Sequence, residues 1–426
     1  MRIALVYSRI PLPMRRADQM TVAHLLAFLK ARDHIVDLFC IKTGAVSSAA
    51  DEDWLRQTCR NVYFYKHDWR AYVRAPLLAL LRAVPLQVGY FSHPQQRKEI
   101  HNEVMAGKYD IVYTYYLRSA ETVRGLGRSP DSRHDGKTPA TFLALQLSQA
   151  LNARRIAQNA PNLWLKWLYQ VESRLVARYE STIWQHFTRT VLIGKADVDE
   201  IKKNCMRRNK PLINNFVFDA HGTDVIRFAP RNDIPVRPHH LVFSGVMRTP
   251  TNVQAVQWFA TNVWPRVRAA VPDATWSIVG REPAPEVRRL ASLAGVEVTG
   301  TVKDPSICIA EAEVCINPMQ AGGGMQNKLI EYLACARPVV ATSVANEGLG
   351  ATPGKDLLIA DQPDDFADAV VELFRNPAHR ERLGAAAREF ALSHWTWEAH
   401  FLKLEQAFYD ALQKEEVPLS EVSSTA

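Results

Sequence analysis

The chain has 426 residues, 47% hydrophobic and 23% charged, an ordinary globular composition that excludes a disordered, collagen-like or disulfide-scaffold protein. Its net charge of +8 is unevenly divided: residues 1–228 hold 34 Lys and Arg against 20 Asp and Glu, whereas residues 229–426 hold 18 against 24. The first half is therefore predicted to face something anionic, such as nucleic acid, a membrane surface or a pyrophosphate-bearing substrate, unless its basic surface is simply solvated.

Targeting and redox signals are weak. The most apolar stretch, residues 75–91, is interrupted by two prolines, Arg82 and Gln87, and is shorter than the roughly 20 residues of a membrane-spanning helix. The start of the chain has too short an apolar run for a secretory signal. The six cysteines form no CxxC pair and no cluster with histidine at metal-ligand spacing. We expect a cytoplasmic protein without a metal site or disulfides.

The first half begins with a β-α-β pattern. Residues Arg2–Tyr7 and His34–Ile41 are short apolar runs typical of buried parallel strands, and the segment between them carries leucines at helical spacing. A right-handed crossover and a parallel sheet follow from this pattern. Further strands are predicted at Asn61–Lys66, Tyr109–Tyr115, Thr141–Leu147 and Arg189–Ile193, with a mobile loop at Gly125–Lys137 and a long helix at Leu163–His186.

The alternation restarts after Arg227–His240, whose three prolines predict a linker. Strands are predicted at Leu241–Val246, Thr275–Val279, Val296–Thr299, Val314–Asn317, Val339–Thr342 and Leu357–Ile359, and a last helix at Trp395–Leu412. We expect an α/β protein with two doubly wound Rossmann-like domains, residues 1–228 and 241–394. Residues 395–413 are expected to pack back on the first domain, and residues 414–426 to be disordered. Because ligands bind at the carboxyl ends of such strands, the expected active site is a cleft between the domains.

The densest signal is QAGGGMQNKLIEYLACARPVV, which starts at Gln320. Three glycines at a strand-to-helix turn let backbone N–H groups approach a ligand, and the helix amino terminus adds partial positive charge, which together make a phosphate cradle. Lys328 and Glu331 lie three apart and share one helix face. Lysine supplies charge to a diphosphate, and glutamate can accept hydrogen bonds from a vicinal diol such as ribose. The alternative is a glycine-rich turn at an ordinary surface helix.

Residues 241–349 resemble the donor-binding half of the retaining, GT-B-fold glycosyltransferases of family 4. The resemblance is carried by SGVM at Ser244, the following TPTNVQAVQWF, SIVG at Ser277, VEVTGTVKD at Val296 and the triglycine motif. The first half resembles a narrower subgroup of sugar transferases associated with bacterial exopolysaccharide and PEP-CTERM systems, through RIPLP, PLQVGYF, VESRLVARYE and HGTDVIRFAP. This resemblance implies the GT-B fold and a nucleotide-diphosphate sugar donor, UDP- or GDP-linked, used without a metal cofactor.

The resemblance also implies roles for individual residues. Glu331 would bind the ribose, and Lys328 with Arg248 would bind the diphosphate and serve catalysis. Further donor contacts are implied at Gly245, Val302, Gly322, Gly323, Gly324, Met325 and Gln326. Gly323 stands where the family has its first glutamate, which leaves the backbone amides of residues 322–325 as the contacts near the donor sugar. The histidine that relatives often carry in the first domain is also missing, because its position reads YTYYL from Tyr113.

Acceptor contacts are predicted in the first half. Arg15 and Arg16 follow the first strand and either meet an acceptor pyrophosphate or are simply solvated. Gln146 and Gln149 follow another strand, where they either bind acceptor hydroxyls or form turn and capping hydrogen bonds.

The leading hypothesis is a hexosyltransferase that moves a sugar, with retention, from a nucleotide sugar to a lipid-linked polysaccharide precursor. It would act in the cytoplasm, with its basic half on the inner face of the plasma membrane. A nucleotide-sugar epimerase of the same fold and a non-catalytic nucleotide-sugar-binding scaffold are alternatives. A dinucleotide oxidoreductase is disfavoured because no GxGxxG follows the first strand, and nucleic-acid binding because no recognised motif is present.

Overall fold

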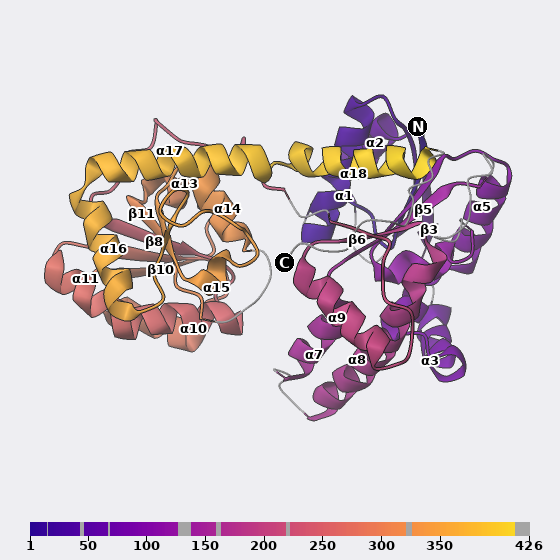
Figure 1. The fold of residues 1–426 in the computed structure, drawn as a ribbon, viewed down its shortest axis with the longest axis horizontal. Helices are drawn as coiled ribbons and strands as arrows, with labels where there is room; N and C mark the ends of the chain where they lie inside the picture. The colour runs from indigo at the N-terminus through magenta and orange to yellow at the C-terminus, as the bar shows by residue number, and fades with distance from the viewer. Residues whose placement is uncertain are drawn as a thin grey trace, which may run out of the picture. The chain divides into compact units, whose positions relative to one another are not determined.

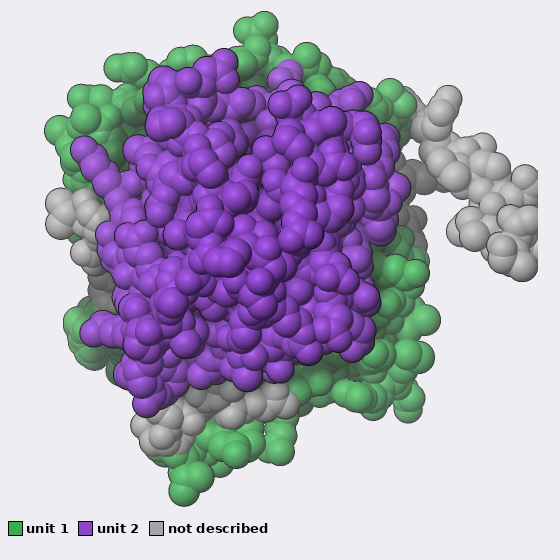
Figure 2. Space-filling model, turned by 90° about the vertical axis from the view of Figure 1, so that its left-hand side faces the viewer, with its two compact units in different colours: residues 1–220, 401–426 green, residues 221–400 purple. Residues whose placement is uncertain are grey.

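The computed structural model describes residues 1–14, 16–42, 47–66, 69–126, 138–158, 163–218, 222–320 and 326–413. The chain divides into two compact units, coloured separately in Figure 2. Unit 1 comprises residues 1–220 together with 401–426, and unit 2 comprises residues 221–400. Most of the predicted loop Gly125–Lys137 and the predicted tail 414–426 lie outside the described residues.

Unit 1 is built on a parallel seven-stranded sheet in the order β3-β2-β1-β4-β5-β6-β7. Its strands are β1 (Arg2–Tyr7), β2 (Ile35–Lys42), β3 (Asn61–Lys66), β4 (Ile111–Tyr115), β5 (Ala140–Gln146), β6 (Arg189–Leu192) and β7 (Phe216–Phe218). The six strands predicted here are confirmed. The sequence patterns missed β7, an edge strand of three residues that buries no side chain fully.

Helices flank this sheet (Figure 1). They are α1 (Ala17–Ala31), α2 (Ala49–Thr58), α3 (Arg70–Arg82), α4 (Leu86–Phe91), α5 (Pro94–Met105), α6 (Ala120–Val123), α7 (Gln149–Gln158), α8 (Leu163–Ile183) and α9 (Lys195–Met206). Local sequence sets several starts: Ser48 and Asp51 form a capping box on α2, and Pro94 occupies the first turn of α5.

The last helix, α18 (Trp397–Leu412), belongs to unit 1 from Phe401 onward. Its Phe408 ring lies 4.8 Å from the ring of Phe142 on β5, measured between centroids. Glu405 accepts hydrogen bonds from Arg32 at 3.0 Å and contacts the His34 ring at 2.7 Å. Burial raises the pKa of Glu405, but these two partners outweigh burial and hold it below its usual value. The helix is therefore an integral part of the unit 1 core.

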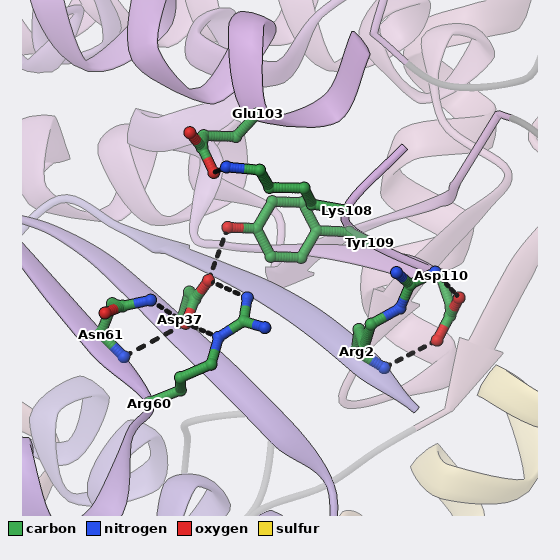
Figure 3. Close-up of polar contacts among 8 residues, drawn as sticks. All are labelled: Arg2, Asp37, Arg60, Asn61, Glu103, Lys108, Tyr109 and Asp110. Carbon is green, nitrogen blue, oxygen red and sulfur yellow. Dashed lines mark hydrogen bonds and ion pairs between the residues drawn. The ribbon is translucent and has the colours of Figure 1, made fainter. Parts of the chain in front are cut away.

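A polar network fixes the amino-terminal edge of the unit 1 sheet (Figure 3). The carboxylate of Asp37 on β2 is 1% exposed and accepts hydrogen bonds from Arg60 at 2.5 Å and from the Tyr109 hydroxyl at 2.7 Å. Beside it, Asp110 accepts from the backbone N–H of Arg2 at 2.7 Å. These contacts tie the starts of adjacent strands together and leave the carboxyl-terminal edge as the ligand-facing side.

Unit 2 has a parallel six-stranded sheet in the order β10-β9-β8-β11-β12-β13. Its strands are β8 (His240–Ser244), β9 (Thr275–Val279), β10 (Val296–Gly300), β11 (Val314–Asn317), β12 (Val339–Ala341) and β13 (Leu358–Ile359). All six were predicted, so the doubly wound α/β class is confirmed for both units. Among the described residues, no helix has both the length and the apolarity needed to cross a bilayer.

The helices of unit 2 cover both faces of its sheet, with α10 and α11 on one side in Figure 1 and α13 and α17 on the other. They are α10 (Pro250–Trp258), α11 (Trp264–Ala270), α12 (Pro285–Arg289), α13 (Pro305–Glu311), α14 (Asn327–Ala334), α15 (Ser343–Asn346), α16 (Pro363–Arg375) and α17 (Pro377–His394). A π-helical turn, Phe259–Val263, joins α10 to α11.

The segment predicted as the linker, Arg227–His240, lies inside unit 2, whose boundary comes at residue 221. Its prolines are accompanied by specific contacts: Arg227 pairs with Asp304 at 3.2 Å, Phe228 is buried, and the backbone N–H of Arg237 donates to the carbonyl of Glu311 at 2.9 Å. A proline-rich composition therefore marks a packed surface strap here, not the connection between the units.

Candidate functional site

A pocket of about 500 Å³ lies in unit 2 at the carboxyl ends of β8 and β9 and the start of α14. This is where the strand order reverses, because β8 has β9 on one side and β11 on the other. Crevices at such switch points are the usual ligand sites of open α/β sheets. The lining residues are Ser244, Gly245, Val246, Asn252, Val279, Gly280, Arg281, Thr301, Val302, Pro305, Asn327, Lys328 and Glu331.

Two glycines let the strand ends approach closely. A Cβ atom on Gly280 would lie 1.6 Å from the carbonyl oxygen of Gly245, and one on Gly245 would lie 2.8 Å from the Asn252 amide nitrogen and 3.3 Å from Lys328 Nζ. Any side chain at Gly280 would therefore push the β8 and β9 loops apart. The SGVM and SIVG motifs are explained by this backbone contact.

Lys328 is buried in the first turn of α14, and its ammonium group reaches the pocket. Within the described residues, the only hydrogen bond of Nζ goes to Asn252 Oδ1 at 2.6 Å, and the Phe243 ring centre lies 4.1 Å away. Burial lowers the pKa of Lys328 to about 7, and nearby Glu331 only partly counters it. A buried ammonium that reaches a pocket with two N–H donors left over is well placed for an anion.

Glu331 lies one turn further along α14, on the same face. Burial raises the pKa of its carboxyl to about 7, against the opposing charges of Arg227 and Lys328. The side chain lines the pocket and can accept hydrogen bonds from a bound diol.

The start of α14 is held against the end of β8. Tyr332 is fully buried, and its hydroxyl accepts a hydrogen bond from the Ser244 backbone N–H at 2.6 Å. Gln326 is the N-cap residue of the helix, and Asn327 lines the pocket. The partial positive charge of the helix amino terminus therefore faces the same space as the Lys328 ammonium.

The structure brings four of the predicted donor residues together around this pocket: Gly245, Val302, Lys328 and Glu331. The predicted contacts at Gly322, Gly323, Gly324 and Met325 lie outside the described residues. Arg248 does not line the pocket: its side chain is 71% exposed and pairs with Glu282 at 2.7 Å. Arg281, the residue after Gly280, is the arginine that does.

Three further residues escaped the sequence analysis. Asn252 holds the Lys328 ammonium, Arg281 lines the pocket, and Arg227 lowers the pKa of Glu331 through its charge. Two of them stand within or next to motifs that carried the resemblance: Asn252 in TPTN and Arg227 in HGTDVIRFAP. Arg281 directly follows SIVG. Proximity to these motifs was the available signal.

In unit 1, Gln146 and Gln149 flank the end of β5 and are 2% and 4% exposed. The carboxylate of Glu180 accepts a hydrogen bond from the Gln149 backbone N–H at 2.6 Å. This capping bond uses the Gln149 backbone and not its side-chain amide. Among the described residues, Gln146 Oε1 and Gln149 Nε2 have no hydrogen-bond partner. Gln146 also has a positive φ of 68°, which is strained for a side chain of this kind. Unsatisfied buried amides beside a strained residue fit a site that a ligand completes.

Of the two predicted arginines of unit 1, the structure describes one. Arg16 is exposed at the N-cap of α1, where its side chain makes no capping bond. Arg15 lies outside the described residues.

The chemistry available in the unit 2 pocket is charge stabilisation. Lys328, Arg281 and the α14 amino terminus supply positive charge, and Glu331 supplies an acceptor. Within the part of the chain that the structure describes, no three His, Cys, Asp or Glu side chains converge as a metal site. Five of the six cysteines are buried, and Cys308 is half-buried.

Comparison with known proteins follows the same division of the chain. Residues 238–376 match the family model described as Glycosyl transferases group 1. An uncharacterized 44.6 kDa protein in the cps region of Klebsiella pneumoniae is 22% identical over 401 residues, covering 91% of this chain and 95% of that protein. A GDP-mannose-dependent monoacylated alpha-(1-6)-phosphatidylinositol monomannoside mannosyltransferase of Corynebacterium glutamicum is 31% identical over 146 residues, covering 32% of this chain and 38% of that protein.

Solved structures agree on the fold. Sucrose-phosphate synthase from Thermosynechococcus elongatus superposes with a TM-score of 0.61 at 17% identity, covering 96% of this chain and 98% of that one. HepE from Anabaena, solved in complex with UDP, superposes with a TM-score of 0.57 at 12% identity, covering 96% and 99%. The expected architecture of two Rossmann-like sheets is that of the GT-B glycosyltransferases.

Proposed function

We propose that this chain, a glycosyltransferase with the GT-B fold and a group 1 donor domain, moves a hexose from a nucleoside-diphosphate sugar to a lipid-linked polysaccharide precursor, retaining the anomeric configuration. The observation that carries the donor half of the proposal is the buried ammonium of Lys328, which faces a pocket with a single described hydrogen-bond partner. A buried cation is expensive unless an anion accompanies it, and a diphosphate is the anion that such a pocket fits.

In the proposed mechanism, Lys328, Arg281 and the α14 amino terminus stabilise the charge that grows on the departing diphosphate. Glu331 holds the ribose diol and so fixes the nucleotide across the pocket. The acceptor hydroxyl attacks the face from which the diphosphate leaves, and a phosphate oxygen takes its proton. No metal is required in this scheme, so EDTA should leave the rate unchanged.

The acceptor half of the proposal has separate support. The Corynebacterium glutamicum relative is named as a phosphatidylinositol monomannoside mannosyltransferase, and the Klebsiella pneumoniae relative as a protein in the cps region. The unsatisfied amides of Gln146 and Gln149 offer contacts for sugar hydroxyls. We place the reaction at the cytoplasmic face of the plasma membrane, where nucleotide sugars and lipid-linked precursors meet.

A thermal-shift screen of the full chain tests the donor half. UDP, GDP, UDP-glucose and GDP-mannose are the probes, and one nucleotide series should raise the melting temperature by several degrees, since a ligand at 100 times its Kd adds about 2.7 kcal/mol. Glu331→Ala should shrink that shift, whereas Glu286→Ala, at an exposed position of the same unit, should not. If no nucleotide moves the melting temperature, the donor assignment fails.

Incubation with donor alone separates transfer from epimerisation. A transferase should give only slow hydrolysis of the nucleotide sugar in the absence of acceptor. An isomerised nucleotide sugar in the product mixture would replace the transferase proposal by the epimerase alternative.

A further inference from the structure

Helix α3 turns its large apolar side chains toward solvent. Tyr72, Val73, Leu77 and Leu81 are 69%, 61%, 51% and 70% exposed, and Trp69, directly before the helix, is 70% exposed. Val73, Leu77 and Leu81 follow one another at intervals of four residues, which places them in one stripe along the helix, and Tyr72 stands beside Val73. A surface helix of a globular protein normally shows the opposite pattern, with its apolar stripe packed against the core.

The inward side of α3 carries two alanines and a leucine. Ala71 and Ala75 are buried, and Leu78 packs against the unit 1 core. The fit against α4 is close: a Cβ on Gly89 would lie 3.0 Å from the Cα of Ala75. The side chains on the outer face therefore cannot exchange places with the alanines without forcing α3 away from α4.

The charges on α3 have one sign. Arg70, Arg74 and Arg82 lie on the helix, which carries no Asp or Glu. Basic residues beside a stripe of Trp, Tyr and Leu are the composition of helices that lie in the interface of an anionic bilayer. Trp and Tyr suit that interface because each has an apolar ring and a polar tip.

A second exposed apolar group stands at the start of α8. Leu163, Trp164 and Trp167 are 83%, 66% and 54% exposed, and the two indole rings stack with centroids 5.3 Å apart. Helix α4 links the two elements, because α3 packs on it and Glu172 of α8 accepts the Leu86 backbone N–H at 2.9 Å. Both α3 and the start of α8 lie at the lower end of unit 1 in Figure 1.

We propose that the outer face of α3, seconded by the tryptophan pair of α8, docks unit 1 onto an anionic lipid bilayer. Charge complementarity selects this partner, since a helix that carries three arginines and no Asp or Glu favours a negative surface over a neutral one. The inference deepens the proposed function, whose lipid-linked acceptor lies in such a surface, but its residues belong to unit 1 and share nothing with the donor pocket.

Vesicle flotation of the full chain tests this directly. Vesicles of phosphatidylcholine mixed with phosphatidylglycerol should carry the protein, and phosphatidylcholine alone should carry much less. The double variant Leu77→Glu, Leu81→Glu should bind the mixed vesicles at least about tenfold more weakly, because it places carboxylates on the docking face. The matched control is Met105→Glu, at an apolar position of α5 that is 73% exposed, which should bind like the native chain.

The outcomes are distinct. Melting temperature and the nucleotide-induced shift should be unchanged in the double variant, which shows that it folds and that the donor pocket is independent. Equal binding of the native chain and the double variant would overturn the docking face. So would a native dimer in sedimentation velocity that the double variant abolishes, because the face would then be an interface between copies of the chain.

Discussion

The carboxyl-terminal edges of the two sheets differ in how side chains occupy them. In unit 2, Gly245 and Gly280 leave a pocket, and Lys328 is buried there with one described hydrogen-bond partner. In unit 1, the end of β1 on the corresponding edge is closed by side chains: Asp18 accepts hydrogen bonds from Tyr7 at 2.9 Å and from Arg9 at 2.8 Å. The charged groups at the end of β1 thus satisfy one another, whereas the buried Lys328 ammonium has a single described partner.

The same contrast extends to the aromatic groups of the unit 1 edge. The guanidinium groups of Arg9 and Arg118 lie 5.7 Å and 5.4 Å from the ring centre of Phe91. Burial lowers the pKa of Arg118, and the charge of Arg9 lowers it further. Side chains that pack on a sheet edge stabilise it. Glycines on an edge contribute no such packing, but they leave space for a ligand.

Removing the Lys328 ammonium should have the largest effect. Lys328→Met deletes the buried cation, so the transfer rate should fall by about 10²- to 10³-fold, the usual cost of one transition-state charge donor. Steady-state kinetics with saturating acceptor measure it. Lys303→Met, at an exposed position of the same unit, should have the native rate.

The same variant should melt at a higher temperature without ligand. The pKa of Lys328 is about 7 in the folded protein against a usual value of 10.5, so the folded state disfavours the charged form. The unfolded chain therefore binds more protons between these values, and native stability rises as pH increases from about 7 to about 10.5. The gain in melting temperature from Lys328→Met should be greatest below pH 7. A loss of stability there would show that the lysine stabilises the core of unit 2.

Gly280→Ala should come next, because its Cβ would lie 1.6 Å from the Gly245 carbonyl oxygen. Overpacking of this kind costs about 3 kcal/mol and should open the pocket, so both melting temperature and nucleotide affinity should fall. Gly354→Ala is the matched control: its φ is +77° but its Cβ would meet open space, so it should lose about 1 kcal/mol and keep its affinity. Equal effects would place the role of Gly280 in backbone conformation alone.

Nucleotide affinity should depend on pH in one direction. Burial brings the pKa values of Lys328 and Glu331 both to about 7, so raising the pH removes a positive charge and adds a negative one. The Kd for UDP or GDP should rise above pH 7 by up to about tenfold per pH unit for each of the two groups. Calorimetry in buffers of different ionisation enthalpy should detect proton uptake, and a flat profile in the native chain would contradict the buried pair.

The smallest effect is expected in unit 1. Gln149→Ala removes an unsatisfied amide and keeps the backbone N–H that Glu180 accepts. The KM for the acceptor should rise about 3- to 10-fold with the donor Kd unchanged, as for one hydrogen bond. Gln57→Ala, an exposed position on α2, should leave both constants alone. A change in donor Kd instead would remove Gln149 from the acceptor side.

The sheet could be predicted from the sequence because buried parallel strands are continuous apolar runs, as in Arg2–Tyr7 and Val314–Asn317. The exception is β7, whose three residues are too few and too exposed to give that pattern. The prolines of residues 227–240 suggested a linker. The contacts that pack this segment, such as Arg227 with Asp304, join residues far apart in the chain, so a local pattern cannot reveal them.

Within the site, Lys328 and Glu331 could be predicted because helical spacing alone puts them on one face. Arg248 and Arg281 each lie close behind a strand-end glycine, and nothing local tells which side chain enters the pocket. The exposure of the outer face of α3 could not be predicted for a related reason. An apolar run in the sequence shows how much hydrophobic surface a segment has, but not whether that surface faces the core or the solvent.

The path of the chain through α18 has a consequence for biosynthesis. Unit 2 is one contiguous stretch, complete when residue 400 has been translated, whereas unit 1 needs Glu405 and Phe408 to cover Arg32, His34 and Phe142. Nascent domains usually mature in the order of their synthesis. Here the unit that starts first on the ribosome closes last, and a stop codon directly after residue 400 would release a complete unit 2 beside a unit 1 that lacks the cover of Glu405 and Phe408.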